Sequence, residues 1–492
     1  IPSITDAEEA VQSKIAAEIS RFTEIWENIK NKYHSVIIQN NFELPPTNYL
    51  GNLSATLHFG INRFVSTLNE KFAVYASTHD NFYIHDLNNL AAKIGLNKWH
   101  NPFQYHAYKF AMNYDVMPVV SLNLAKIIRA VFGKNKKCLV LDLDNTLWGG
   151  VIGDDGPSGI QIGQENGVAQ SYYEFQQYIG QVKNLGILLN VCSKNDEANA
   201  LEGLNHPEGA LKVDDFVIIK ANWDPKDRNV LNIASELNIM PDSIVFVDDN
   251  PAEREIVTAQ IPGVCAPVMD SVENYIINID RNGYFENTAI SSDDLNRNQM
   301  YKENIQRQMT QAAFSDYGEY LTSLEMQAEI RDFIPLYLER IVQLTNKSNQ
   351  FNLTTRRYSD AEMDEVMQSP EYIRLYGKLY DKFGDNGVVT VVIGKKKERE
   401  LHMDLWLMSC RVLKRDMEQA VMDVLAQKCR EQGIEKIYGY YYPTKKNGMV
   451  KTHYGTLGFS LVSESEDGSS VWELDVNGYT DQNKYISIME EK

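Results

Sequence analysis

The sequence predicts an α/β protein built from several domains. Its length of 492 residues exceeds that of one ordinary domain, and its hydrophobic content of 43% is typical of a globular chain. Short apolar runs of strand length alternate with helical patterns through the first 285 residues. This alternation is typical of strand–helix–strand units, which form parallel sheets covered by helices.

Charge and cysteine content exclude several classes of function. The net charge of −19 argues against non-specific binding to nucleic acids. No apolar run approaches the length needed to cross a bilayer, so we expect no association with membranes. The five cysteines are scattered and odd in number, which favours a reduced, cytoplasmic protein. The chain begins at Ile1 without the pattern of a signal peptide, and we expect further residues upstream of it.

Residues 1–131 are predicted to form a separate α/β domain. The expected elements are a helix over 7–32, a strand over 34–39, a helix over 61–74, a strand over 82–86 and an apolar helix over 119–131. The pattern is similar to the later half of an SGNH-hydrolase-like, flavodoxin-like fold. His85, Asp86 and His100 could be a catalytic remnant. Turn and core-edge roles are favoured, because no serine nucleophile accompanies them, and we assign this domain no chemistry.

The most informative stretch follows, because the apolar run Cys138–Leu141 ends in two acids, Asp142 and Asp144. In open α/β sheets, ligands bind at the carboxyl ends of the strands. A carboxylate there can attack phosphorus as a nucleophile, and a second can protonate the leaving oxygen. Both would require a cation that prefers oxygen ligands, most plausibly Mg²⁺. The alternative is that two acids simply end a strand in a turn.

Three further polar groups follow predicted strands or open helices. Ser193 ends the run that starts at Ile187, and Asp248 with Asp249 ends the run that starts at Ser243. Lys226 opens a helical pattern and could neutralise a phosphate as a point charge, although Lys220 is a nearby rival. Each motif alone could arise by chance, but four in order at predicted element ends favour a single site.

In this order, the four motifs resemble those of the haloacid dehalogenase (HAD) superfamily, subfamily IIIC type. Its members have a Rossmann-like core and mostly transfer phosphoryl groups through an aspartyl-phosphate. The spacing between Lys226 and Asp248 is typical of the superfamily, which favours Lys226 over Lys220. The resemblance implies the following roles: Asp142 as nucleophile, Asp144 as acid and base, Ser193 and Lys226 as phosphate-binding groups, Asp142, Asp248 and the backbone carbonyl of Asp144 as Mg²⁺ ligands, and Asp249 and Thr146 as supporting groups.

The predicted HAD-like core spans residues 132–285, and the intervals between its motifs leave no room for a sizeable cap. We expect the Gly-rich segment 148–156 to form a small hairpin flap, with Asp154 and Asp155 as turn residues. A core without a cap favours a macromolecular or carrier-tethered substrate over a small free phosphate ester. Residues 286–330 are predicted to be a linker with helices.

The last predicted domain, residues 331–492, has a strand and helix order similar to the GNAT N-acyltransferase fold. The motif Tyr454-Gly-Thr-Leu-Gly-Phe459 adds to this similarity. In that family a Gly-rich loop binds the pyrophosphate of CoA at a helix N-terminus. Here the matching segment 411–416 lacks both glycines and ends in Asp416. The phosphopantetheine arm of a carrier protein would therefore suit it better than acetyl-CoA.

Two stretches, Asp142-Leu-Asp-Asn-Thr-Leu-Trp-Gly-Gly150 and Asn349-Gln-Phe-Asn-Leu-Thr-Thr-Arg-Arg357, resemble FkbH-like proteins. In these a HAD core is fused to an acyltransferase-like module. The resemblance implies that a glyceryl unit is taken from 1,3-bisphosphoglycerate, loses phosphate and is loaded onto the thiol of an acyl carrier protein. Cys410 is a candidate acyl-accepting thiol, although a buried core role is equally consistent with its position.

Arg411, Asn447 and Tyr454 complete the candidate acyl-transfer set. Two alternatives stay open at this stage. One is a plain phosphatase for a small metabolite, with a separate N- or O-acyltransferase module. The other is a non-catalytic scaffold, against which the intact set of four motifs counts.

Overall fold

The computed structural model describes residues 1–33 and 35–489, with the side chains of residues 292, 293, 347, 360 and 410 left outside the description. The chain divides into two compact units. The first unit comprises residues 1–131 and 358–365, and the second comprises residues 132–357 and 366–492. Among the described residues, no helix combines the length and the apolar character that crossing a bilayer requires.

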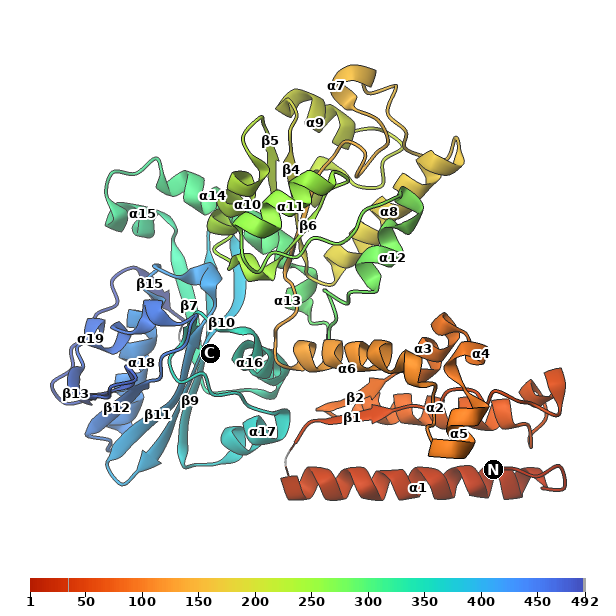
Figure 1. Cartoon of the computed structure of the whole chain (residues 1–492). Helices are drawn as coiled ribbons and strands as arrows, with labels where there is room; N and C mark the ends of the chain where they lie inside the picture. Colours follow the sequence, from red (N-terminus) through yellow and green to blue (C-terminus); the bar gives the residue numbers. More distant parts are fainter. Residues whose placement is uncertain (34, 490–492) are drawn as a thin grey trace. The chain divides into compact units, whose positions relative to one another are not determined.

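Residues 1–131 of the first unit, drawn in red to orange in Figure 1, contain a pair of parallel strands packed against helices. Its elements are α1 (Glu8–Tyr33), β1 (Ile37–Asn40), η1 (Gly51–Ala55), α2 (Ile61–Thr78), β2 (Phe82–His85), α3 (Leu87–Ile94), α4 (Leu96–Trp99), α5 (Pro102–Tyr108), η2 (Tyr114–Val116) and α6 (Met117–Val131). Trp26, Phe72 and Phe82 are buried between α1, α2 and β2, with ring centroids 4.7–5.0 Å from that of Trp26. The strand predicted over 34–39 begins at Ile37, and residue 34 lies outside the described residues.

The polar residues noted in this unit have structural partners. Asp86 caps α3 by accepting a hydrogen bond from Asn89 N at 3.0 Å. The buried His85 contacts Asn40 Oδ1 through Nδ1 at 2.9 Å. His100 ends α4, and its ring lies 5.8 Å from that of Tyr105. These contacts agree with the favoured turn and core-edge roles.

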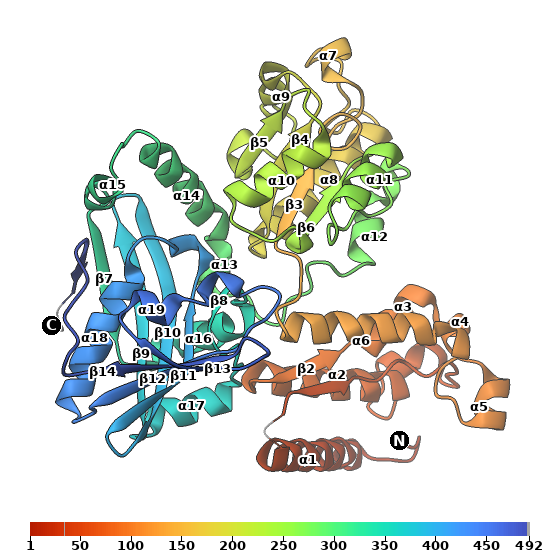
Figure 2. The same ribbon diagram turned by 60° about the vertical axis from the view of Figure 1, so that its left-hand side comes forward.

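The second unit begins with a parallel sheet that is four-stranded within the described residues, in the order β5-β4-β3-β6 (Figure 2). The strands are β3 (Cys138–Leu141), β4 (Leu188–Ser193), β5 (Ile218–Ala221) and β6 (Ile244–Val247). Leu141 lies opposite both Val191 and Val247 in the register. Because all pairs are parallel, the carboxyl ends of β3, β4 and β6 lie at one edge of the sheet.

Strand residues alternate between two buried faces, which explains the nearly continuous apolar runs in the sequence. Leu139 and Leu141 pack with α8 (Gly167–Asn184), α9 (Glu197–Leu204), η5 (Val272–Asn274) and α12 (Tyr275–Asp280). Cys138 and Val140 pack on the other face with α10 (Lys226–Glu236), α11 (Pro251–Gln260) and α14 (Arg297–Gln311). The connections also contain η3 (Val213–Asp215), η4 (Pro241–Ser243) and α13 (Ser292–Leu295).

The Gly-rich segment after β3 does not form the predicted hairpin flap. It contains the short helix α7 (Ile152–Asp155), and Gly149 pairs with Gln161 in an isolated bridge. Asp155 accepts a hydrogen bond from Val151 N at 2.8 Å and so closes a helical turn. The prediction was wrong because the carboxylate of an Asp residue can accept a hydrogen bond from a backbone N–H at the start of a helix as well as in a hairpin turn.

The second unit continues with a mixed sheet that has nine strands in the described part of the chain, drawn in cyan to blue in Figure 1. Its order is β13-β14-β12-β11-β10-β9-β7-β15, and β8 pairs with β11 off this path. The strands are β7 (Met326–Arg331), β8 (Phe351–Asn352), β9 (Tyr372–Asp381), β10 (Gly384–Lys397), β11 (Glu400–Met408), β12 (Lys436–Tyr441), β13 (Ser460–Glu464), β14 (Ser470–Asp475) and β15 (Ile486–Ile488).

One helix, α18 (Met417–Glu431), contributes a large part of the core of this sheet. Its residues Met417, Val421 and Leu425 are fully buried with those of β9, β10 and β11. The remaining helices of the second unit are α15 (Tyr317–Ser323), α16 (Pro335–Lys347), η6 (Cys410–Val412), η7 (Gly448–Val450) and α19 (His453–Thr456). Helix α17 (Asp360–Gln368) begins in the segment 358–365, which belongs to the first unit.

Helix α14 contacts both sheets of the second unit. Near its start, Asn298 donates to Ile187 O at 2.9 Å and accepts from Leu189 N at 3.3 Å. Further along the helix, Arg307 forms a buried ion pair with Asp381 of β9 through two hydrogen bonds of 2.7 and 2.8 Å. The segment predicted as a linker with helices is therefore packed structure in this part.

Candidate active site

The first strand of the parallel sheet delivers Asp142 to the carboxyl edge. Asp142 N still donates to Val247 O of β6 at 2.9 Å, so the strand pairing extends to this residue. The chain then turns, with Asn145 at a φ of 52°. Asp142 is buried, and its Oδ1 accepts a hydrogen bond from Leu143 N at 2.8 Å. These contacts fix the carboxylate at the end of β3.

The last strand of the sheet delivers two more carboxylates to the same edge. Asp248 and Asp249 follow β6 directly, and Pro251 then opens α11. Within the described residues, Asp142, Asp248 and Asp249 form a group whose carboxylate oxygens lie within 4.8 Å of one another. Asp249, predicted to be a supporting group, thus has its carboxylate beside the two predicted ligands.

Lys226 lies between two of these acids. Its Nζ is 2.7 Å from Asp142 Oδ2 and 2.6 Å from Asp248 Oδ2, and its side chain is buried. Lys220 instead forms an ion pair with Glu236 at 2.7 Å. The structure thus brings Lys226, which the sequence favoured over Lys220, to the acids.

Close packing of like charges shifts the proton affinities of this group. Burial and the charge of Asp142 raise the pKa of Asp248 to about 6, against the opposing effect of Lys226. Burial and the same neighbour also raise the pKa of Asp249. Burial alone would lower the pKa of Lys226, but the charges of Asp142 and Asp248 outweigh it and raise that pKa. The cluster therefore favours a positive charge at its centre.

Asp144 is held apart from the three clustered carboxylates by its own hydrogen bonds. Its Oδ1 accepts from Trp148 Nε1 at 2.9 Å and Ile152 N at 3.1 Å, and its Oδ2 accepts from Asn195 Nδ2 at 3.0 Å. Burial raises the pKa of Asp144, although the donors at Ile152 and Trp148 oppose the rise. The contact of Asn195 was not predicted from the sequence, although Asn195 lies two residues after the strand-ending Ser193.

Two hydroxyl residues complete the edge. Ser193 is the last residue of β4 and is buried. Thr146 is also buried, and its Oγ1 accepts a hydrogen bond from Asp249 N at 3.2 Å. Thr146 thereby connects the loop after β3 with the loop after β6.

The donor set fits a hard divalent cation. Three carboxylates that converge on one point supply the oxygen ligands that Mg²⁺ prefers. Lys226 supplies one positive charge, which is less than the negative charge of the three carboxylates. A divalent cation would therefore relieve the remaining repulsion.

The four candidate acyl-transfer residues lie in different surroundings. The side-chain amide of Asn447 is buried, donates to Asn352 O and Tyr442 O at 2.9 Å each, and so holds two segments together. Tyr454 is buried in the core of the large sheet. Arg411 lines a cavity, whereas the side chain of Cys410 lies outside the described part of the chain.

The segment before α18 is used for internal contacts. Arg415 is buried, donates to Arg411 O at 2.7 Å and pairs with Asp381 at 3.2 Å. Asp416 occupies the cap position of α18 at a φ of 59°. Burial raises the pKa of Glu418, in the first turn, to about 7. Acidic side chains at this helix start disfavour a bound pyrophosphate.

Two comparisons with known proteins bear on this site. Residues 5–129 match the FkbH N-terminal domain family. The N-terminal part of the protein BF1531 from Bacteroides fragilis, which contains a phosphatase domain and was solved in complex with Mg, is 32% identical to this chain. The match has a TM-score of 0.55 and covers 58% of this chain and 76% of that one.

The chain belongs to the same family as BF1531. Together with the four motifs, three at strand ends and one at a helix start, this relationship identifies the region around the parallel sheet as a HAD-type phosphatase domain. Among curated proteins, no sequence matches this member of the BF1531 family.

Acetyltransferase structures resemble only a part of this BF1531 relative. The ribosomal-protein-S18-alanine N-acetyltransferase of Escherichia coli is 11% identical, covers 32% of this chain with all of its own, and gives a TM-score of 0.25. Ard1 from Thermoplasma volcanium is 18% identical, covers 30% of this chain with 97% of its own, and gives a TM-score of 0.24. TM-scores this low do not establish a shared fold, and the GNAT-like character of residues 331–492 stays a prediction.

Proposed function

We propose that this protein is a Mg²⁺-dependent phosphatase or phosphotransferase that acts through an aspartyl-phosphate on Asp142. The observation that carries the proposal is the convergence of three carboxylates around Lys226 at the carboxyl edge of the parallel sheet. The Mg complex of the related phosphatase domain supports the choice of cation.

The proposed reaction has two displacements at phosphorus. A carboxylate oxygen of Asp142 attacks the phosphoryl group, the bond from phosphorus to the leaving oxygen breaks, and Asp144 donates a proton to that oxygen. Asp144 then takes a proton from water as the water oxygen attacks the aspartyl-phosphate. Phosphate leaves, and Asp142 and protonated Asp144 are restored.

The remaining groups bind and orient the phosphoryl group. Lys226 and the hydroxyl of Ser193 would bind its oxygens, and Thr146 would hold the loop of Asp249 in place. When bound by Asp142, Asp248 and Asp249, Mg²⁺ would neutralise the negative charge shared by phosphate and carboxylates.

The test is release of phosphate from p-nitrophenyl phosphate and from acetyl phosphate, with Mg²⁺ and with EDTA. We expect release only with Mg²⁺, and none from Asp142→Asn. Lys226→Gln should lose most of the activity, whereas the matched variant Lys220→Gln, whose lysine pairs with Glu236, should keep it. Activity of Asp142→Asn equal to that of the wild type would contradict the proposed nucleophile.

We further propose that phosphate removal is coupled to loading of a glyceryl unit onto the phosphopantetheine thiol of an acyl carrier protein. This part rests on the FkbH-like sequence stretches and on the match of residues 5–129 to the FkbH N-terminal domain family. The substrate would be an acyl phosphate such as 1,3-bisphosphoglycerate, and Cys410 would be the candidate intermediate thiol.

Mass spectrometry of a holo-carrier protein, incubated with this chain and 1,3-bisphosphoglycerate, tests the coupled reaction. A glyceryl adduct on the carrier, lost in Cys410→Ala, is expected. An unmodified carrier beside rapid hydrolysis of a small ester would instead favour the plain phosphatase, with a separate acyltransferase module.

A further inference from the structure

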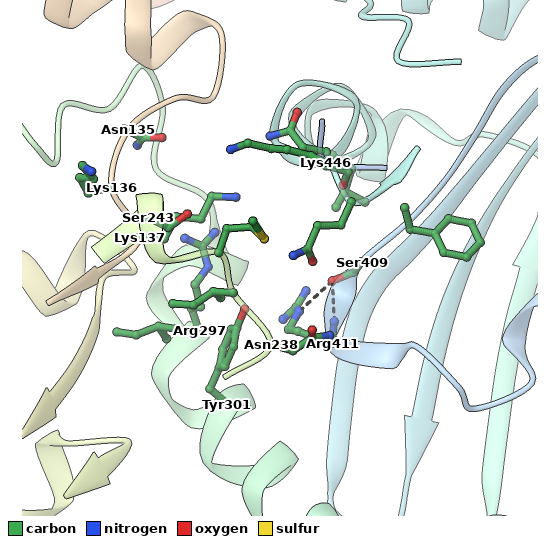
Figure 3. Close-up of a pocket in the computed structure, with 18 of the residues that line it drawn as sticks. Asn135, Lys136, Lys137, Asn238, Ser243, Arg297, Tyr301, Ser409, Arg411 and Lys446 are labelled. Carbon is green, nitrogen blue, oxygen red and sulfur yellow. Dashed lines mark hydrogen bonds between the residues drawn. The ribbon is translucent and has the colours of Figure 1, made fainter. Parts of the chain in front are cut away.

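A second site lies at the opposite edge of the parallel sheet from Asp142. There, a cavity of about 130 Å³ is lined by residues at the amino ends of the strands (Figure 3). Lys136 and Lys137 immediately precede β3, and Ser243 immediately precedes β6. The length of β3, with a rise of about 3.3 Å per residue, separates this cavity from the proposed catalytic carboxylates.

The facing wall comes from later parts of the second unit. Residues 348–351 include the start of the stretch 349–357, which resembles FkbH-like proteins in sequence. Ser409 and Arg411 follow β11, and Lys446 follows β12. Arg297 and Tyr301 come from α14, and Figure 3 shows these side chains around one space.

The lining is strongly basic. Among the described residues, the basic side chains at the cavity are Lys136, Lys137, Arg297, Arg340, Arg411 and Lys446, and no carboxylate lines it. Lys446 pairs with Asp242 at 2.6 Å and Arg297 pairs with Asp294, and both of these acids lie outside the lining. In a chain with a net charge of −19, such a concentration of positive charge indicates a preference for anions.

Lys136 shows that the site is built into the interior. Only 6% of its surface is exposed, and its Nζ donates to Asp242 O at 2.7 Å and Gly263 O at 2.9 Å. Both acceptors are neutral carbonyls, so these contacts orient the ammonium group without cancelling its charge. Burial of a charge in this way is costly unless an opposite charge approaches it.

Neutral donors add to the cations. Asn287 Nδ2 is buried and has no hydrogen-bond partner among the described residues, while Asn287 Oδ1 accepts from Asn135 at 3.1 Å. Arg411 Nε donates to Ser409 Oγ at 3.2 Å, which orients the guanidinium beside the cavity. Amide, guanidinium and ammonium N–H groups are the donors that phosphate oxygens accept.

We propose that this cavity binds a small phosphorylated ligand, either inorganic phosphate or a small phosphate ester, separately from the phosphatase site. A cavity of about 130 Å³ suits a ligand of this size, because drug-sized ligands occupy about 300–1,000 Å³. The ligand would connect the amino ends of β3 and β6 with the segments 348–351 and 409–411. The proposal does not depend on the proposed enzymatic activity.

Isothermal titration calorimetry on the full chain tests the site. Asp142→Asn in EDTA serves as the background, so that binding at the proposed catalytic carboxylates is suppressed. The probes are inorganic phosphate and glycerol 3-phosphate, with glycerol as the uncharged comparison. We expect at least one of the two phosphate probes to bind and glycerol not to bind, and the probe that binds identifies the source of the phosphate.

Matched lysine pairs assign the binding to the cavity. Lys137→Gln and Lys446→Gln remove lining charges, whereas Lys134→Gln and Lys445→Gln remove exposed neighbours that do not line the cavity. We expect each lining variant to bind the phosphate probe about tenfold more weakly, and the two neighbour variants to bind it with unchanged affinity. Circular dichroism and the unfolding midpoint without ligand verify folding.

Because the side chain of Lys446 is 39% exposed, Lys446→Gln keeps the test valid if Lys137→Gln fails to fold. Two outcomes would overturn the proposal. One is the absence of binding by both phosphate probes, and the other is an equal loss of affinity in the lining variants and their neighbours.

Discussion

The hydroxyl of Thr146 accepts a hydrogen bond from Asp249 N at 3.2 Å and thereby connects two strand-end loops that are distant in sequence. We expect Thr146→Val, which removes this acceptor inside the protein, to lower the free energy of unfolding by about 1–3 kcal/mol. Phosphatase activity should fall as well, because the Asp249 carboxylate loses its support. Thr146→Ser keeps the hydroxyl and should retain most of the stability and most of the activity. Chemical denaturation measures the stability, and phosphate release measures the activity.

Replacing Lys226 by Met should make the protein depend on the cation for stability. Removal of the ammonium leaves Asp142 and Asp248 buried beside each other, and loss of one partner of a buried pair costs about 3–5 kcal/mol. Since a cation that binds only the folded state stabilises it, Mg²⁺ should raise the unfolding midpoint more in Lys226→Met than in the wild type. An equal rise in both would argue against a cation site at these carboxylates. Lys220→Met is the control, because it disrupts only a partly exposed pair.

Asp144→Asn should separate proton transfer from nucleophilic attack. The hydrogen bonds from Trp148 and Ile152 can still form with an amide oxygen, and the one from Asn195 is lost, so the fold should be kept with a small loss of stability. Hydrolysis of an alkyl phosphate, whose leaving oxygen needs a proton, should fall by about 10²–10⁴. Hydrolysis of acetyl phosphate should fall less, and steady-state rates on the two substrates measure the difference. A uniform fall on both would point to a role other than acid catalysis.

The stability of the protein should decrease as the pH falls below about 6.5, in part because of His453. Burial lowers the pKa of this residue to about 3, and only 7% of its surface is exposed. In the unfolded chain a histidine takes up its proton near pH 6.5, so the unfolded state binds more protons between these values and gains relative stability. The effect amounts to about 2 kcal/mol at pH 5.

His453→Phe should therefore show a flatter dependence of unfolding free energy on pH between 7 and 5. The phenyl ring can keep the edge contacts that His453 makes with Phe351 and Trp406. Urea unfolding at several pH values gives the slopes. Parallel slopes for the wild type and the variant would show that His453 does not contribute.

Three strands of the parallel sheet, β3, β4 and β6, could be predicted because each is an apolar run buried on both faces. The order of Asp142, Lys226 and Asp248 at element ends was also readable, since parallel strands bring their carboxyl ends to one edge. The approach of the Asp249 carboxylate to Asp142 and Asp248 required coordinates, as did the ion pair of Lys220 with Glu236. Both depend on where a helix starts and how a loop turns, which strand periodicity does not encode.

The cavity at the opposite edge could not be predicted. Its lining combines Lys136 with Arg297 and Arg411, which no local pattern relates. The prediction of a hairpin flap over 148–156 was wrong for another reason. A short segment with several turn-forming residues can adopt more than one local conformation. In the structure, this segment forms α7, in which the Asp155 carboxylate accepts a hydrogen bond from Val151 N.

Helix α14 is anchored at one end to β4 through Asn298 and further along to β9 through Arg307. Its first turns also carry Arg297 and Tyr301, which line the basic cavity. Because the helix contacts both sheets, a displacement of α14 at the cavity would change its contacts with both of them. If a ligand in that cavity altered the geometry at the proposed catalytic carboxylates through α14, binding at the two sites would be thermodynamically linked, and a ligand at either site would change the affinity at the other by the same factor.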